Sequence, residues 1–302
     1  MQKKIRIGTR GSELALWQAN YVAGLIGGSS TEIVIIKTEG DRIQNVSFNK
    51  MEGKGFFTKE IEEALLDNRI DLAVHSLKDL PTDDVEGLRV AAIPERGDYH
   101  DILIMHTDVY ENNGGLDIKS GSLVGTSSMR RMAQLKSLEP SLRVEALRGN
   151  VNTRLRKLKD REYDAIVMAK AGAERVSLDL SEFAVLELDE RIFLPAPAQG
   201  ALGLQIRVGD DYTASVVEKL RDPETERLVK AERSFLKHFG GGCHVPLGAL
   251  AEIDGDDIIL RGIVASPDGT FVAREFAAGA DPEEVGAELA GLIKGKGADK
   301  YI

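Results

Sequence analysis

The stretch "KIRIGTRGSELALWQANYVAGLIGGSSTEIVIIK", residues 4–37, decides the class of the fold. "KIRIG" predicts a short strand, and "EIVIIK" predicts a second one. Between them, residues 12–26 have the apolar spacing of an amphipathic helix, with Ser12 as its N-cap. The pattern continues with a helix in "TKEIEEALLDNR" and a buried strand in "IDLAVHSL". Strands that alternate with helices at this spacing indicate an α/β fold with a mostly parallel sheet.

A second unit of the same kind begins near residue 101. Its strands are predicted in "DILIM" (101–105), "SLVG", "LRVEAL" and "DAIVMA", and its helices begin at Ser127 and Asn150. A helix-rich stretch, 211–239, precedes three predicted antiparallel strands, "LGALAEI", "IILRGIVA" and "TFVAREFA", and a last helix near 282–293. Because 302 residues exceed the size at which one hydrophobic core stops growing, we expect two or three domains.

The charge distribution points to a local anion site. The net charge of -10 argues against general affinity for nucleic acid or for anionic membranes. Between Gly125 and Arg161, however, ten Lys/Arg face three Asp/Glu, a net of +7. A solvated helix face with uneven charge is the alternative. An RNA-binding module would need stacking aromatic residues, which this tract lacks.

Targeting and redox features of the chain are simple. A single cysteine excludes an internal disulfide and leaves no cysteine cluster for structural zinc. Neither an apolar signal segment nor a membrane span is recognisable. We therefore expect a cytoplasmic protein without membrane partners.

Arginines and hydroxyls follow strands at several predicted strand-to-helix junctions. They occur in "GTRGS" (8–12), "VGTSSMRRMAQL" (124–135) and "ALRGNVNTRLRKL" (146–158). Free backbone N–H groups and guanidinium groups at such junctions bind carboxylates or phosphates. The alternative is an N-capped helix with surface arginines, and for any one junction the sequence supports both interpretations equally. Since no P-loop lysine and no GxGxxG motif is present, a polycarboxylate is favoured over a nucleotide.

Other candidate residues lie in loops or at strand ends. In "AVHSLKDLP", Asp79 could act as an acid or base or stabilise a cation, although a turn aspartate is the alternative. His75 in the same stretch is expected to pack within the strand. The polar, aperiodic residues 38–56 predict a mobile functional loop. His100 and Asp101 lack obvious partners for a metal site, and no metal is predicted.

Eight motifs, in order over almost the whole chain, closely resemble the porphobilinogen deaminase (hydroxymethylbilane synthase) family. They are "IGTRGSELALWQA", "GKGFFTKEIEEALL", "AVHSLKDLPT", "VGTSSMRRMAQL", "LRGNVNTRLRKL", "YDAIVMAKAGAERV", "LPAPAQGALGLQ" and "GGGCHVPLGA". The resemblance implies two lobes like those of periplasmic binding proteins, with mixed, mostly parallel sheets, and a small α+β C-terminal domain with an antiparallel sheet. The implied domains are 1–95 with 196–216, then 96–195, and then 217–302.

The activity implied by the resemblance is a transferase reaction of tetrapyrrole biosynthesis. Four porphobilinogen molecules condense head to tail, with loss of ammonia, and water releases hydroxymethylbilane. The family builds this chain on a dipyrromethane cofactor held by a thioether bond, and the glycine-flanked Cys243 matches the anchor. The enzyme is expected to act as a monomer. A non-catalytic anion-binding protein with the same two lobes is the alternative, but it would need neither Asp79 nor Cys243.

The resemblance also assigns roles to individual residues. Asp79 matches the catalytic carboxylate. The positions that match cofactor-binding residues are Lys78, Asp79, Ser128, Arg130, Arg131, Arg148, Arg154, Gln199 and Gly200. Those that match substrate-binding residues are Arg10, Ser12 and Arg175, and those of a lid-like loop are Lys50, Lys54 and Phe57. Departures from the family pattern at Glu39, Tyr99 and Ala198 receive no role.

Overall fold

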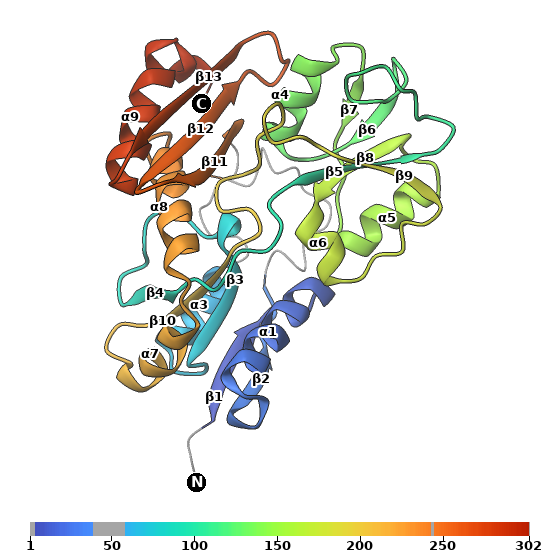
Figure 1. Cartoon of the computed structure of the whole chain (residues 1–302). Helices are drawn as coiled ribbons and strands as arrows, with labels where there is room; N and C mark the ends of the chain where they lie inside the picture. The colour runs from blue at the N-terminus through green and yellow to red at the C-terminus, as the bar shows by residue number, and fades with distance from the viewer. Residues whose placement is uncertain (1–3, 39–57, 243–244, 302) are drawn as a thin grey trace. The chain divides into compact units, whose positions relative to one another are not determined.

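The computed structural model describes residues 4–38, 58–242 and 245–301, which divide into two compact units (Figure 1). The first unit comprises Met1–Gly97 with Gly200–Arg227, and the second comprises Asp98–Gln199 with Leu228–Ile302. The chain therefore passes between the units three times. In the described ranges, no helix combines the length and the apolar character that a membrane span requires.

The first unit is built on a five-stranded sheet with the order β2-β1-β3-β10-β4. The strands are β1 (Ile5–Thr9), β2 (Thr31–Ile35), β3 (Leu72–Ser76), β4 (Leu88–Ala92) and β10 (Leu202–Arg207). β1 pairs in parallel with β2 and β3, whereas β10 pairs antiparallel with β3 and β4. The helices are α1 (Glu13–Ile26), α3 (Lys59–Leu66) and α7 (Asp211–Val217).

Helices bury both faces of this sheet, which explains the continuous apolar run in β3. Leu72 and Val74 pack in one cluster with residues of α1, while Ala73 packs in another with residues of α3. Strands buried on both faces have near-continuous apolar sequences rather than alternating ones.

The second unit repeats the same strand arrangement in the order β7-β6-β8-β5-β9. The strands are β5 (Asp101–His106), β6 (Leu123–Gly125), β7 (Arg143–Glu145), β8 (Ala165–Ala169) and β9 (Phe183–Glu187). β6 pairs in parallel with β7 and β8, and β5 pairs antiparallel with β8 and β9. The helices that follow these strands are α4 (Met129–Leu138), α5 (Val151–Lys159) and α6 (Lys170–Arg175).

A three-stranded antiparallel sheet completes the second unit. It consists of β11 (Leu247–Asp254), β12 (Asp257–Ala265) and β13 (Val272–Gly279). α9 (Pro282–Gly295) and the C-terminal part of α8 (Pro223–Lys237) pack on it through a shared apolar core that includes Phe235 and Leu289 (Figure 1).

The predicted fold class is confirmed, since two mixed sheets with parallel strands accompany a small antiparallel sheet with helices. The antiparallel strand of each five-stranded sheet is the one that follows a passage between the units, β5 in the second unit and β10 in the first. The strands β4, β9 and β10 were not among those predicted from apolar spacing. The division into three domains with the boundaries given above stays a prediction.

Candidate active site

In the first unit, predicted site residues lie where β1 and β3 end. Arg10 follows β1, and Ser12 caps α1, because its Oγ accepts a hydrogen bond from the Ala15 N–H at 3.4 Å. Lys78 and Asp79 lie in the 3-10 turn Leu77–Asp79 directly after β3. Since β1 and β3 are parallel, both junctions lie at the carboxyl edge of the sheet, where α/β proteins bind ligands.

Asp79 differs in its surroundings from the buried acids of the chain. Its side chain is exposed and makes no hydrogen bond or ion pair with the described residues. The turn that carries it is fixed, because the Leu77 N–H donates to the Ala201 carbonyl at 3.0 Å. The structure therefore presents an ionisable carboxylate on a well-anchored turn.

In the second unit, most of the predicted site residues lie at the equivalent edge. Ser128 caps α4 and accepts from the Arg131 N–H at 3.4 Å. Arg148 lies between β7 and α5, Arg154 lies in the first turn of α5, and Arg175 ends α6, which follows β8. Because β6, β7 and β8 run in parallel, the structure brings their carboxyl ends to one edge.

The loop after β7 depends on one glycine. Gly149 has φ +114°, a conformation that residues with a side chain rarely adopt. A Cβ atom at this position would lie 2.4 Å from Thr153 Cγ2. The Arg154 Nε–H donates to the Gly149 carbonyl at 2.9 Å, so that this turn and the half-buried Arg154 guanidinium fix each other.

Arg130 and Arg131 are buried, and both bind Asp101, the first residue of β5. The Arg130 Nη1 and Arg131 Nη2 atoms each lie 2.7 Å from an oxygen of this carboxylate. Burial alone would raise the pKa of Asp101, but the two guanidinium charges outweigh it and hold that pKa far below its usual range. Sequence reasoning found the two arginines but not their partner, which lies about thirty residues earlier and carries no motif of its own.

Gln199 and Gly200 stabilise two of the three segments by which the chain passes between the units. The buried Gln199 amide donates to the Tyr99 carbonyl at 2.8 Å and to Asp101 Oδ1 at 3.0 Å. The Gly200 carbonyl accepts from the Gly97 N–H at 3.3 Å. Both residues therefore cross-link the connecting segments, and Gln199 also contacts the carboxylate that binds Arg130 and Arg131.

Two of the departures from the family pattern can be located. Ala198 is buried with φ +60°, and its N–H donates to Glu232 Oε2 at 2.6 Å. The Tyr99 ring stacks on the His100 ring with 4.5 Å between their centroids. The predictions for Glu39, Lys50, Lys54, Phe57 and Cys243 lie outside the described residues.

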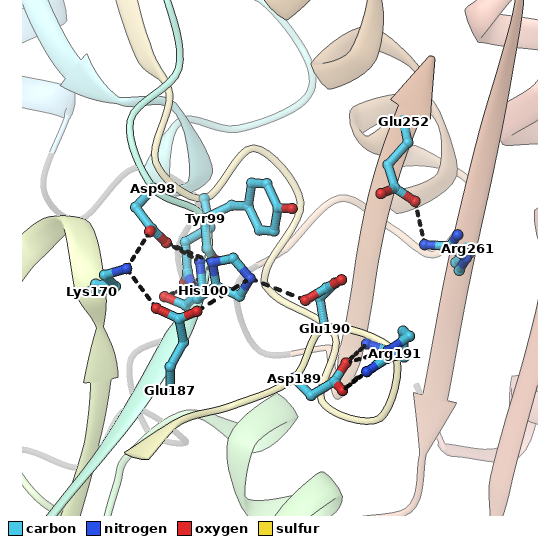
Figure 2. Close-up of polar contacts among 11 residues, drawn as sticks. Asp98, Tyr99, His100, Lys170, Glu187, Asp189, Glu190, Arg191, Glu252 and Arg261 are labelled. Carbon is cyan, nitrogen blue, oxygen red and sulfur yellow. Dashed lines mark hydrogen bonds and ion pairs between the residues drawn. The ribbon is translucent and has the colours of Figure 1, made fainter. Parts of the chain in front are cut away.

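A second polar cluster of the same unit surrounds His100 (Figure 2). The His100 ring donates toward Asp98 Oδ1 at 2.9 Å and Glu190 Oε2 at 3.0 Å. The Lys170 ammonium group forms ion pairs with Asp98 and Glu187. Partial burial alone would lower the pKa of His100, but its carboxylate partners raise that pKa above the usual 6.5.

This cluster has the residue types of a metal site. The ligand atoms of Asp98, His100 and Glu187 lie within 4.8 Å of one another. Lys170, however, already supplies a cation between Asp98 and Glu187. A divalent ion would have to displace it, so that the geometry favours a network of ion pairs over a metal centre.

The segment that leads to Cys243 is described up to Gly242. Phe239, just beyond α8, is buried and packs edge-on against Phe235 with 5.2 Å between the ring centroids. Gly240 and Gly241 both have positive φ, +87° and +70°. The chain returns to the core at the buried Val245. The described residues on both sides of the cysteine are thus anchored, and Gly240 and Gly241 adopt a backbone conformation that favours glycine.

The donor set at the edge of the second unit fits a polyanionic group. Arg130 Nε is buried and has no hydrogen-bond partner among the described residues, so that it is available to donate to a further acceptor. Arg148 and Arg154 are partly exposed and within six residues of each other. Guanidinium groups recognise carboxylates by paired hydrogen bonds.

Comparison with known proteins gives one consistent result. The family model described as porphobilinogen deaminase, dipyromethane cofactor binding domain, matches residues 5–215, and the model of the C-terminal domain of the same enzyme matches residues 227–295. Curated relatives named porphobilinogen deaminase include that of Oceanobacillus iheyensis, 42% identical over 99% of this chain and 97% of the relative. Those of Shouchella clausii and Bacillus subtilis are 45% and 42% identical, over 99% and 100% of this chain and 96% of each relative.

Solved structures with distant similarity include bacterial periplasmic proteins and domains. A Salmonella typhimurium periplasmic binding protein with high arginine specificity has a TM-score of 0.42 and 12% identity, over 74% of this chain and 96% of that one. The periplasmic VFT2 domain of BvgS from Bordetella pertussis has a TM-score of 0.40 and 14% identity, over 72% and 87%. Similarity at this level says nothing about function.

Because both family models match in order and the relatives align over almost their whole length, the chain belongs to the porphobilinogen deaminase family, transferases with a dipyrromethane cofactor.

Proposed function

We propose that this chain condenses four porphobilinogen molecules head to tail, with loss of ammonia, on a dipyrromethane attached to Cys243, and then releases hydroxymethylbilane by hydrolysis. The observation that supports this most strongly is the gathering of arginines and helix N-termini at the carboxyl edge of β6, β7 and β8. Porphobilinogen carries an acetate and a propionate, so that each added pyrrole brings two more carboxylates. A site for such a polyanion needs many guanidinium donors, and this edge supplies them.

When bound, the dipyrromethane supplies the free pyrrole carbon from which the product chain grows. The side chains proposed to hold its carboxylates are Lys78, Ser128, Arg130, Arg131, Arg148 and Arg154, with Gln199 and Gly200 in the adjoining segments. Arg10, Ser12 and Arg175 are proposed to bind the acid groups of incoming porphobilinogen. Lys50, Lys54 and Phe57 are proposed to belong to the loop that covers the site.

Asp79 is the proposed catalytic carboxylate. Porphobilinogen becomes a cation when it loses ammonia, and a negative charge beside the pyrrole nitrogen stabilises that cation. The same carboxylate can accept a hydrogen bond from the pyrrole N–H and exchange a proton with it. The fixed turn after β3 supports this role, because a catalytic group must be held in place while the substrate changes charge.

We further propose the three-domain division 1–95 with 196–216, 96–195 and 217–302, and a cytoplasmic monomer without nucleic-acid or membrane partners. The expected role in tetrapyrrole biosynthesis supports the cytoplasmic localisation. Sedimentation equilibrium of the purified protein would test the monomeric state, and a mass near 32.9 kDa is expected. A concentration-independent mass of twice that value would contradict it.

The reaction itself is tested by stoichiometry. Purified protein supplied with porphobilinogen should release one hydroxymethylbilane and four ammonia molecules for every four porphobilinogen molecules consumed. The matched control is Cys243→Ser, which cannot form the thioether and should lose nearly all turnover. Wild-type protein that binds porphobilinogen but releases no ammonia would favour the non-catalytic alternative.

A further inference from the structure

Asp101 accepts hydrogen bonds from several of the proposed cofactor-binding side chains of the second unit. Its two oxygens accept hydrogen bonds from Arg130 Nη1 at 2.7 Å, from Arg131 Nε and Nη2 at 3.1 and 2.7 Å, and from Gln199 Nε2 at 3.0 Å. These donors come from the first turn of α4 and from the connecting segment before β10. One fully buried acid therefore fixes three side chains to which the family resemblance gives a role in cofactor binding.

Strand direction explains why this acid lies at the ligand edge. β5 runs antiparallel to β8, and Asp101 is paired with Ala169, the last residue of β8. The beginning of β5 thus lies at the same edge as the ends of β6 and β8.

The charges of this cluster do not cancel. Asp101 is the only described acid that forms an ion pair with Arg130 or Arg131, which leaves a net charge of +1. All three side chains are at least nine-tenths buried. The Phe193 ring lies 5.9 Å from the Arg130 guanidinium carbon, but an aromatic face does not neutralise the charge. A buried net charge is costly unless an opposite charge completes it.

The first unit contains a comparable cluster of acids and arginines. Asp71, directly before β3, binds Arg6 and Arg207, and Arg207 also binds Asp210. In these ion pairs two acids face two arginines, and the cluster lies at the amino end of β3, away from the carboxyl edge of the sheet. The cluster around Asp101 is different both in its position and in its uncompensated charge.

Arg130 Nε, which has no hydrogen-bond partner in the described ranges, is a second and independent observation at the same guanidinium group. One carboxylate of a ligand would accept a hydrogen bond from this donor and would also neutralise the buried net charge of +1. We propose that Asp101 is the positioning residue of the cofactor site: it fixes Arg130 and Arg131 in the arrangement that receives one carboxylate of the dipyrromethane. Asp101 itself does not touch the cofactor. The inference rests on the proposed function.

The test compares Asp101→Glu with Asp71→Glu. Each substitution keeps the negative charge and shifts it by one methylene, so that the ion pairs and the fold persist while the arginines move. Apoprotein of each variant is incubated with porphobilinogen, and the mass of the intact protein is followed over time. Per folded molecule, Asp101→Glu should load the cofactor about tenfold more slowly or worse, the effect of misaligning one charged hydrogen bond. Asp71→Glu should load at the wild-type rate.

Asp101→Asn removes the charge and is expected to load still less cofactor. If this variant does not fold, the result for Asp101→Glu decides whether Asp101 has the positioning role. Loading of Asp101→Glu at the wild-type rate would overturn the positioning role, and so would an equal defect in Asp71→Glu. Wild-type apoprotein that gains no mass from porphobilinogen would instead contradict the proposed function. The KM for porphobilinogen, measured on the loaded fraction of Asp101→Glu, should rise less than the loading rate falls, because the proposed role concerns the cofactor.

Discussion

Replacing Asp79 by Asn separates a catalytic carboxylate from a turn aspartate. Asp79 is exposed and has no partner among the described residues, so that the substitution should change the free energy of unfolding by less than about 0.5 kcal/mol. If its charge stabilises the cation formed on loss of ammonia, turnover should fall by about 10²–10³-fold, as when one transition-state partner is removed elsewhere. Asp79→Glu keeps the charge but displaces it, and should lie between wild type and Asp79→Asn.

The assay measures the thermal midpoint and the turnover of the same loaded protein. Asp84→Asn is the matched control, because Asp84 is another exposed aspartate in the segment after β3 and the charge change is identical. It should leave both quantities unchanged. Full activity of Asp79→Asn, once corrected for the loaded and folded fraction, would refute the catalytic assignment. A lower thermal midpoint at unchanged turnover would identify Asp79 as a turn residue.

Three further substitutions test the packing around the site. Arg131→Leu should reduce cofactor content and also destabilise the fold by about 1.5–3 kcal/mol, because Asp101 loses charged hydrogen bonds while it stays buried; an unchanged denaturation midpoint would contradict this. Gly149→Ala should cost about 1–3 kcal/mol in chemical denaturation, since φ is +114° and the new Cβ would meet Thr153. The raised pKa of His100 means that its ion pairs stabilise the fold below pH 6.5 and lose this effect as the pH rises through the higher folded-state pKa. The stability difference between wild type and His100→Gln should therefore shrink from about pH 5.5 to about pH 9, and a constant difference would count against the network.

Much of the fold could be predicted because its signals are local. Ser12 was predicted as the cap of α1 and is its cap, and Asn150 caps α5, where a helix start was expected. The helix predicted to begin at Ser127 is capped one residue later, by Ser128. Capping and apolar spacing act within a few residues, so that they can be recognised without knowledge of the tertiary structure.

The missed strands depend on contacts that are remote in sequence. β10 pairs with β3, although the two are more than one hundred residues apart. "FAVLE" of β9 is a short apolar run that could equally belong to a buried helix. Short runs of this kind become strands only because a sheet edge is available, which the sequence does not show.

The residues of the site also include some that could be predicted from local sequence and some that could not. Arg130 and Arg148 could be recognised because each lies beside a strand-to-helix junction. The partner of Arg130, Asp101, lies 29 residues away, and the partner of His100, Glu190, lies 90 residues away. Side-chain pairs at such separations follow from strand order and direction. They could not be read from spacing along the chain.

The covalent state of Cys243 tests the central claim most directly. Active protein is digested, and the mass of the peptide that contains Cys243 is determined together with the intact mass. We predict an addition equal to two linked pyrroles, located on the Cys243 sulfur, in every active molecule. An unmodified Cys243 peptide recovered from fully active protein would contradict the account.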